Sequence, residues 1–377
     1  MAVAMFVFRT GVAFRIVEHP AFHEMFACVC PSMIFPDRHQ LGDGLLTAAY
    51  KAEWNSVIAK IKEQNYVALV SDGWSNPRRE KMIGEVIDEI EKEIGKGKVV
   101  SITTDNASSM QSAWSILETT RPGFMATGCA AHALSLLMKD VLTSNTLKTI
   151  LREAKEISLF IRSHTATNSR FSTVQSANPQ GCQRGLKLPI VTRWYSSYEC
   201  IKLVMENEIA LRELFSDREL LSKYDSATVS ILSELVASEV FWAKGAVALQ
   251  LLEPIHKCLA HFESDRVCLS VIYQQFVELR SQPIYNNNEP GIRKPLQDFF
   301  RERIEYRWGF IRKDAMIISY LLDHTTSTST FFGDDKIYTI QALVNLAAAL
   351  GYGEAKQEQL QRELTQFMLD KLSWNDD

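Results

Sequence analysis

The sequence predicts a predominantly helical α/β protein, with its few strands in the first third of the chain. Two short runs of β-forming residues, Tyr66–Val70 and Val99–Thr103, flank an amphipathic stretch, Glu80–Ile94, with helical spacing of its apolar residues. A strand–helix–strand unit of this kind places its strands parallel in one sheet, with a right-handed crossover. Most of the remaining sequence has the apolar period of helices.

The N-terminal residues 1–64 predict helices over Met1–Val17 and Leu45–Ile61. Beyond the second strand we predict helices in His132–Val141, Thr146–Ile161, Val229–Phe262, Leu269–Arg280, Pro295–Tyr306, Lys313–Leu322 and Lys356–Leu372. Two polar segments rich in turn-forming residues, Thr165–Pro189 and Ser281–Gly291, predict loops, and Gly333–Asp335 predicts a further break.

Each of the two predicted strands is followed closely by an aspartate, Asp72 and Asp105. The carboxyl ends of neighbouring parallel strands meet at one edge of the sheet, where functional residues gather in α/β folds. Two carboxylates at that edge would be able to share a divalent cation. The alternative is structural: Asp-Gly is a common turn pair, and Asp105 would cap a helix that begins near Ala107.

Composition narrows the class of protein. The 377 residues carry a formal net charge of −4, so a nucleic-acid surface would have to be a local patch. The 7 cysteines have no framework spacing, which favours a reduced, intracellular protein. We find no apolar run of membrane-spanning length and no signal peptide. We also find no Gly-rich phosphate loop, G-x-S-x-G elbow or H-E-x-x-H motif.

Four short motifs resemble the hAT superfamily of DNA transposases and their domesticated relatives. They are DGWSN, TDNASSM, GCAAHALSLLMKD and TRWYSSYE, in this order along the chain. The resemblance implies an RNase H-like core interrupted by a large all-α insertion. It divides the chain into an N-terminal helical segment (1–64), the core (65–140), the insertion (141–350) and a C-terminal helix returning to the core (351–377).

The resemblance also implies a catalytic and metal-binding triad. Asp72 and Asp105 match the first two acids of the family, and we assign the third to Glu363, with Glu354 and Glu358 as neighbours on the same predicted helix. The family cleaves DNA and transfers strands with two divalent metals, so Mg²⁺ or Mn²⁺ is the implied cofactor. The implied partners are DNA, in particular transposon ends, and other copies in a homo-oligomer. The implied location is the nucleus.

The sequence departs from the family pattern. The β-hairpin that normally follows the first strand is missing between Asn76 and Lys81, so the core is reduced, and we expect the C-terminal dimerisation segment to be absent. We therefore predict a degenerate transposase copy that retains nucleic-acid binding at best. The alternative function is a non-catalytic protein-interaction module built on the helical insertion.

One basic stretch lacks acidic residues between positions 162 and 194. It contains the nucleic-acid-binding candidates Arg162, Arg170, Arg184, Lys187, Arg193 and Trp194. Cationic side chains neutralise phosphates, and an aromatic ring stacks on an unpaired base. The alternative is a basic loop without a partner.

Two Cys/His pairs occur at the same spacing. Cys129 and His132 are structural or DNA-proximal by the resemblance. Cys129 and His132 would form one half of a zinc site, and Cys258 and His261 the other half. The alternative is that these cysteines are small buried side chains, which is the commoner role of cysteine.

Overall fold

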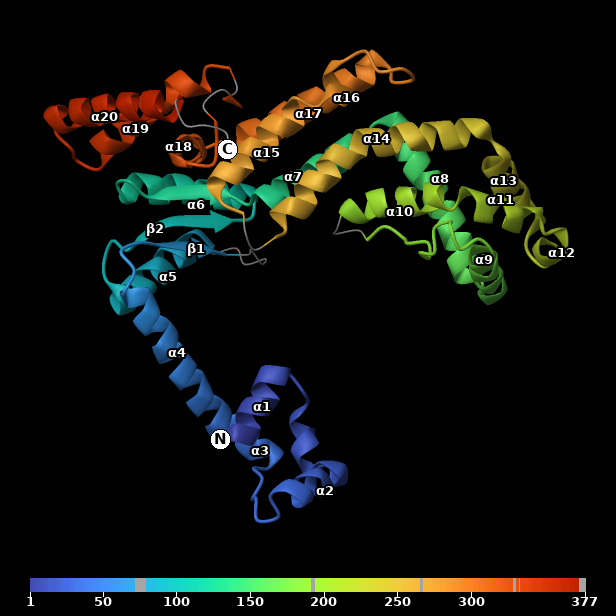
Figure 1. Ribbon diagram of the computed structural model, residues 1–377, viewed down its shortest axis with the longest axis horizontal. Helices are drawn as coiled ribbons and strands as arrows, with labels where there is room; N and C mark the ends of the chain where they lie inside the picture. The colour runs from blue at the N-terminus through green and yellow to red at the C-terminus, as the bar shows by residue number, and fades with distance from the viewer. Residues whose placement is uncertain (72–78, 191–193, 265–266, 328–329, 332, 373–377) are drawn as a thin grey trace. The chain divides into compact units, whose positions relative to one another are not determined.

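The computed structural model describes residues 1–71, 79–190, 194–264, 267–327, 330–331 and 333–372 (Figure 1). Strands are β1 (Val67–Val70), β2 (Val99–Thr104) and β3 (Met125–Gly128). Helices are α1 (Ala2–Thr10), α2 (Pro20–Val29), α3 (Arg38–Gln40), α4 (Leu46–Lys62), α5 (Arg79–Ile94), α6 (Ser108–Thr120), α7 (Ala130–Val141), α8 (Asn145–Ser163), α9 (Thr165–Ala177), α10 (Tyr195–Glu206), α11 (Glu208–Ser216), α12 (Arg218–Leu221), α13 (Ser226–Ala237), α14 (Glu239–Phe262), α15 (Leu269–Arg280), α16 (Pro283–Asn286), α17 (Lys294–Ile311), α18 (Asp314–Leu322), α19 (Asp335–Ala349) and α20 (Glu354–Leu372). A 3₁₀ turn (Phe14–Glu18) and a π turn (Leu41–Leu45) complete the N-terminal region.

The three strands form one sheet in the order β1-β2-β3. Val67 N donates to Lys98 O at 2.8 Å and Ser71 N donates to Thr103 O at 2.9 Å, so the partners advance together along the chain, as in a parallel pair. This confirms the predominantly helical α/β class and the predicted strand–helix–strand unit. The carboxyl ends of β1 and β2 consequently lie at one edge.

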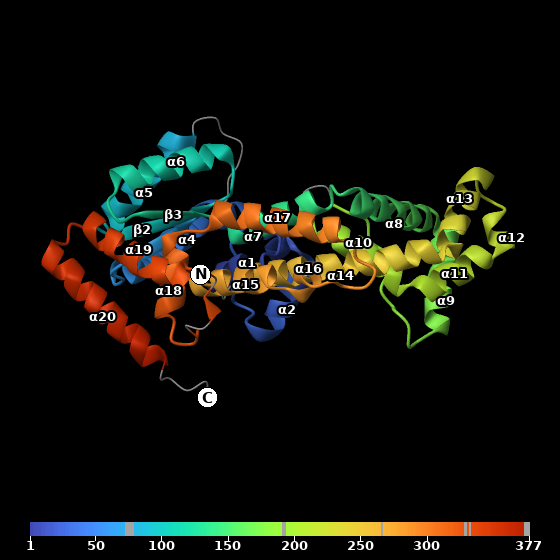
Figure 2. The same cartoon turned by 90° about the horizontal axis from the view of Figure 1, so that it is seen from above.

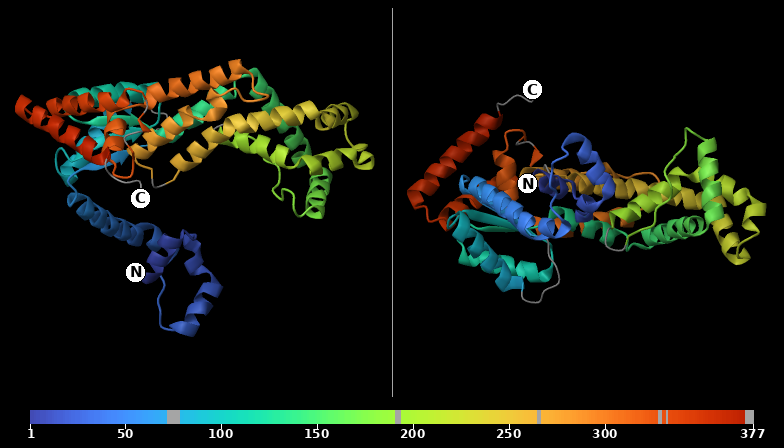
Figure 3. Two further views of the ribbon diagram at one scale, coloured as in Figure 1. Left: turned by 45° about the horizontal axis from the view of Figure 1, so that its top comes forward. Right: turned by 90° about the horizontal axis from the view of Figure 1, so that it is seen from below.

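The chain divides into two compact units. The first comprises Met1–Leu69 together with α5 and β2 as far as Ile102. Its N-terminal helices (blue in Figure 3) enclose a small apolar cluster that includes Val3, Val7 and Phe22. In its second part, buried Glu91 of α5 accepts hydrogen bonds from Gly97 N and Val99 N at 2.9 and 3.2 Å, which joins the end of α5 to the start of β2.

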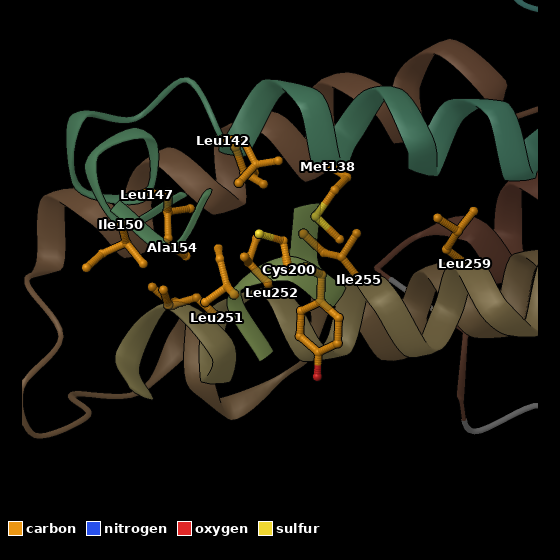
Figure 4. Close-up of a cluster of buried hydrophobic side chains, with 14 of the residues drawn as sticks. Met138, Leu142, Leu147, Ile150, Ala154, Cys200, Leu251, Leu252, Ile255 and Leu259 are labelled. Atoms are coloured by element: carbon orange, nitrogen blue, oxygen red, sulfur yellow. The ribbon is translucent and has the colours of Figure 1, made fainter. Parts of the chain in front are cut away.

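The second unit comprises Val70, Ser71 and the chain from Thr103 onward. Figures 1 and 2 both show α14 running beside α7. Figure 4 shows side chains of α7, α8, α10 and α14 pointing toward one another in the main hydrophobic cluster, among them Met138, Ile150, Cys200, Leu251 and Ile255. This interdigitated core holds the helical region together.

Three predicted elements differ from the structure. The loop predicted over Thr165–Pro189 is wrong in its first half, where α9 forms because Phe171 and Val174 are buried against neighbouring helices. The helical stretch predicted over Val229–Phe262 is two helices, α13 and α14, bent by 67°. The N-terminal helix ends at Thr10 because Gly11 adopts a left-handed cap with φ 68°.

The tail helix α20 packs on α18 and α19 through Leu364 and Met368. Buried Lys371 near its end donates to Leu321 O, Asp323 O and Thr326 Oγ1 at 2.5–3.0 Å, which satisfies all three protons of the ammonium group. Burial lowers the pKa of Lys371. The end of α20 is thus fixed to the segment that follows α18.

In the described ranges, no single helix is long and apolar enough to cross a membrane; the bent pair α13–α14 passes that test of length and composition. Ten residues of α14 are buried within the protein core. All seven cysteines lie in described segments, and each is a free thiol.

Candidate functional site

Asp105 lies directly after β2, at the carboxyl edge of the sheet. The strand buries Val99, Ile102 and Thr104, which fixes the direction in which the chain leaves the sheet. Asp105 Oδ1 accepts a hydrogen bond from Ala107 N at 3.2 Å. The bond closes a local turn, but Asp105 does not cap the helix as the structural alternative predicted, because the N-cap residue of α6 is Ala107 and has no side-chain cap hydrogen bond. The second carboxylate oxygen of Asp105 has no described partner.

A hydrogen-bonded clamp joins the turn after β2 to the turn after β3. Cys129 N donates to Thr104 O at 2.7 Å, and Asn106 Nδ2 donates to Cys129 O at 3.0 Å. Trp114 Nε1 donates to Thr104 Oγ1 at 3.0 Å. The two turns therefore hold each other in place, and Asp105 lies between two residues of this clamp.

Gly128 is required by the close approach of Asn106. A Cβ atom at Gly128 would lie 2.0 Å from Asn106 Oδ1 and 3.0 Å from the Trp114 ring. Asn106 is 8% exposed, and its Oδ1 has no hydrogen-bond partner among the described residues. Only a glycine leaves room for this amide.

A cavity of about 670 Å³ opens at this edge of the sheet. The ends of β1 and β2 and the first turn of α7 contribute most of its walls. The lining residues are Val70, Ser71, Thr103, Thr104, Asp105, Cys129, Ala131, His132, Ser135, Tyr195 and Glu263. Asp72 directly follows Ser71 but lies outside the described residues, so its side chain is not placed.

Cys129 and His132 lie in the first turn of α7, on the wall of this cavity. Cys129 is the N-cap residue of the helix, and its Sγ accepts a hydrogen bond from His132 N at 3.5 Å. The second Cys/His pair is split, because Cys258 is buried in the core while His261 is exposed. Burial raises the pKa of the Cys258 thiol. The structure thus places only the first pair at the site.

Glu263 is a cavity residue that the sequence analysis missed. It follows the last residue of α14, is exposed, and has no side-chain partner among the residues that the structure describes. The signal in the sequence is weak: an acid at the end of a long helix is ordinary. Only the fold brings it to the same cavity as Asp105.

Glu363 lies elsewhere on the structure. It is exposed on α20, its Oε1 accepts a hydrogen bond from Gln359 Nε2 at 2.8 Å, and it is absent from the residues that line the cavity. Its role as third acid stays a prediction.

The basic stretch is largely paired with carboxylates. Arg170 contacts Asp217 at 3.1 Å, Arg184 contacts Glu206 at 2.7 Å, and Lys187 contacts Glu199 at 3.4 Å. The hydrogen bond from Arg184 to Glu206 raises the pKa of that guanidinium. A cation that is already neutralised must lose its partner before it contacts a phosphate.

Glu199 is the centre of this network. Besides Lys187 it lies 3.8 Å from Arg184 and 3.8 Å from His256. His256 stacks on the Tyr198 ring at 4.2 Å, and burial lowers the pKa of this histidine. Burial also raises the pKa of Tyr198 to about 12. The network therefore joins the segment after α9 to both α10 and α14.

Arg162 and Trp194 have a different setting. Arg162 Nη1 donates to Leu186 O at 2.9 Å, a neutral acceptor, so its charge has no carboxylate partner among described residues. Trp194 is half-buried against the core, and Lys139 Nζ lies 5.5 Å from its ring centre. The next residue, Tyr195, lines the cavity. Arg193 falls outside the described residues.

The described residues alone do not form a complete ligand set for the implied divalent metals, and Asp72 lies outside them. Across the segments that the structure describes, no group of three or more His, Cys, Asp or Glu side chains is arranged to hold a metal ion. Asp105 and Glu263 are oxygen donors of the type that Mg²⁺ and Mn²⁺ prefer. Two carboxylates do not make the triad that the resemblance implies, and we derive no chemical step through a metal.

Two family models match parts of this chain. Residues 75–157 match a family described as a domain of unknown function, DUF659, and residues 127–234 match the ZBED1 RNase-like helical domain. These matches point to a transposase-like protein of the hAT/ZBED type, and they cover the cavity wall from α7 and the basic stretch. No curated protein matches the chain.

Proposed function

We propose that this chain is a transposase-derived protein that binds nucleic acid at the cavity edge of its sheet. The observation that carries the proposal is the cavity itself: Asp105, the first turn of α7 and Tyr195 line one space, within the region that the two family models match. Ancestral activity would be metal-dependent DNA cleavage and strand transfer, with nuclear location as its corollary.

The candidate residues are not equally suited to contact nucleic acid. Trp194 with Lys139 above its ring, and Arg162 with its unneutralised charge, are better suited to nucleic acid than the three cations held by carboxylates. An aromatic ring beside a lysine combines base stacking with phosphate neutralisation. In this proposal Arg170, Arg184 and Lys187 stabilise the fold instead.

A salt series tests this assignment. Binding of a short fluorescent single-stranded and a duplex DNA to the full chain is measured by anisotropy at several salt concentrations. We expect Lys139→Ala to lower the salt slope by about one and Trp194→Ala to weaken single-strand binding by about tenfold. Arg170→Ala is the matched control and leaves both quantities unchanged. If only the control variant weakens binding, the assignment is wrong.

Divalent-metal binding is tested separately. If Asp105 and Glu263 bind Mn²⁺, the metal raises the melting temperature of the parent but not of Asp105→Asn, and Glu263→Gln shows a reduced shift. Glu363→Gln compares the predicted third acid directly. A shift abolished by Glu363→Gln and unchanged in Glu263→Gln favours the original triad.

The second candidate function is a protein-interaction module. It is favoured by the carboxylate pairing of three cations of the basic stretch, Arg170, Arg184 and Lys187. A parent protein whose affinity for DNA is undetectable even at low salt would support this alternative.

A further inference from the structure

The end of α2 and the turn that follows it carry four sulfur-containing side chains. They are Met25, Cys28, Cys30 and Met33, so that each thiol has a thioether three positions away in the sequence. Cys28 and Cys30 are exposed free thiols, and Met25 is 56% exposed. Cysteine and methionine are among the residue types most often buried, so a group of them that is accessible to solvent suggests a ligand that sulfur binds.

Helix α2 presents Met25 and Cys28 to solvent from the same side. Its opposite side packs on the N-terminal apolar cluster, in which Phe22 is buried and Phe26 half-buried. Met25 and Cys28 are three positions apart, so their side chains project within about 60° of each other around the helix axis. The first thioether therefore neighbours the first thiol on the open side of the helix.

Cys30 lies just beyond the helix, so its thiol is not held on the side opposite Cys28. In a continued helix the two side chains would project about 160° apart. Cys30 instead adopts φ −148° and ψ 78°, and its N–H donates to Phe26 O at 2.7 Å. These dihedral angles lie outside the helical region. The end of α2 thus separates the direction of the second thiol from the helical period.

The spacing of the two cysteines suits one metal ion between two sulfur atoms. The Cα atoms of residues two positions apart lie within about 7 Å of each other. Two thiolates on opposite sides of one ion lie roughly 4.6 Å apart, since a metal–thiolate bond is about 2.3 Å long. Rotation about the two Cα–Cβ bonds is enough to reach this separation, so no change of the backbone is required.

A tight turn brings the second thioether back to the second thiol. Met33 N donates to Cys30 O at 3.1 Å, which closes a turn with Pro31 at its second position. Met33 packs against the N-terminal apolar cluster, and the Phe35 ring lies 5.4 Å from the Phe22 ring. The turn is therefore anchored on both sides, by α2 before it and by the apolar cluster after it.

We propose that Cys28 and Cys30 bind one Cu(I) ion as a pair of thiolates, with the thioethers of Met25 and Met33 beside it. Thiolate and thioether sulfur are the ligands that select Cu(I), whereas Mg²⁺ and Mn²⁺ are bound by oxygen. Each thiol releases its proton to solvent as its sulfur bonds to the ion. The ion keeps its oxidation state, so binding needs no electron donor or acceptor. The site is independent of nucleic-acid binding.

Zinc fits this segment less well. Structural Zn²⁺ takes four ligands, from cysteines separated by two to four residues and from histidines, whereas one residue separates Cys28 and Cys30. The histidine nearest in the sequence, His23, packs its ring on that of Phe35 with centres 4.9 Å apart. In the described ranges no group of three or more His, Cys, Asp or Glu could hold a metal ion, and a site of two thiolates agrees with that result.

Competition for Cu(I) between the full chain and the coloured chelator bicinchoninate tests the proposal, in oxygen-free buffer with reduced thiols. We expect the parent to withdraw about one equivalent of Cu(I) and to release about two protons per ion, counted with a pH dye. Cys28→Ser and Cys30→Ser each lower the affinity by at least about 100-fold, because a direct ligand is lost. Met25→Leu and Met33→Leu lower it by less than about tenfold, because the thioethers only support the thiolates.

Cys268→Ser is the matched control. Cys268 is also an exposed free thiol but lies in the second unit, so its replacement leaves the affinity for Cu(I) unchanged. Far-UV circular dichroism verifies that every variant is folded. Four results would overturn the proposal: a parent that withdraws no Cu(I), a loss confined to one of the two cysteine variants, an equal loss in Cys268→Ser, or displacement of the bound Cu(I) by an equal concentration of Zn²⁺.

Discussion

Helices α14 and α4 show opposite uses of apolar side chains. Of the 24 residues of α14, ten are buried, nine of them in the main core, including Leu251, Leu252 and Ile255 (Figure 4). The 17 residues of α4 include no buried one, although Tyr50 and Trp54 are large apolar side chains. Apolar area removed from water within the chain stabilises the fold, whereas apolar area left exposed on a regular helix favours association.

The largest expected contrast is between two leucine-to-alanine substitutions. Leu251 is fully buried, and Leu251→Ala should lower the free energy of unfolding by about 3 kcal/mol through lost transfer energy and a cavity. Leu46 is 39% exposed, and Leu46→Ala should change the stability of the folded monomer by less than about 0.5 kcal/mol. Urea unfolding, with hydrogen exchange of α14 amides for Leu251→Ala and of α4 amides for Leu46→Ala, measures both. Equal effects would remove the contrast.

Local sequence patterns predicted the elements whose burial follows a regular period. These patterns predicted β1, α5, β2 and α7. The spacing between apolar residues is about two in the strands and nearly four in the helices, so a change of spacing along the chain separates one element from the next. Helix α9 was missed because Ser, Thr and Asn dominate it, and only tertiary packing of Phe171 and Val174 stabilises it. β3 was missed since four residues ending in glycine carry no clear strand signal.

The site was predictable only where it is local to the strand–helix–strand unit. Asp105 follows from the end of β2, and the cavity confirms that the ends of β1 and β2 open to one space. Glu263 could not be predicted, because it reaches the cavity through the packing of α14. The carboxylate partners of Arg170, Arg184 and Lys187 were invisible for the same reason: they lie on other helices or past the loop.

The second test concerns Gly128, which lies in the close-packed clamp between the turns after β2 and β3. Its setting contrasts with that of Gly84 on α5, which has open space around it. Gly128→Ala should cost about 2 kcal/mol because the new methyl group must displace the Asn106 amide. Chemical denaturation measures the loss. In Gly128→Ala/Asn106→Ala the two effects should fall short of additivity, because the colliding group is gone. Strict additivity would show that Asn106 is not the obstacle.

We also expect the loss of folding stability at acid pH to come mainly from paired carboxylates of the second unit. Asp323 accepts hydrogen bonds from Ser270 Oγ and from Thr325 N and Oγ1, and these lower its pKa from 3.8 to about 2. A depressed pKa stabilises the fold above the unfolded value of 3.8, and this stabilisation is lost as the pH falls toward about 2. Partial exposure limits the effect to about 1 kcal/mol.

The measurement is the difference in unfolding free energy between the parent and Asp323→Asn as a function of pH. We expect this difference to shrink between pH 3.8 and about 2. Glu24→Gln on α2 is the control for an exposed carboxylate without a described partner. A difference that stays constant across this window would mean that the hydrogen bonds to Asp323 do not stabilise its charged form.

The smallest expected effect is a gain in folding stability, and it concerns the helix propensity of one residue in the first unit. Gly84 lies inside α5, and a Cβ atom there would meet no described atom within 4 Å. Gly84→Ala should therefore raise stability by about 0.5–1 kcal/mol, because alanine loses less backbone entropy in a helix. Gly95→Ala is the matched control: its φ of 117° belongs to glycine, so alanine there is destabilising. Thermal unfolding compares the two. If Gly84→Ala also destabilised the protein, the surface of α5 around Gly84 would have to be packed against other residues. The contrast between a close-packed second unit and an exposed first unit would then not include α5.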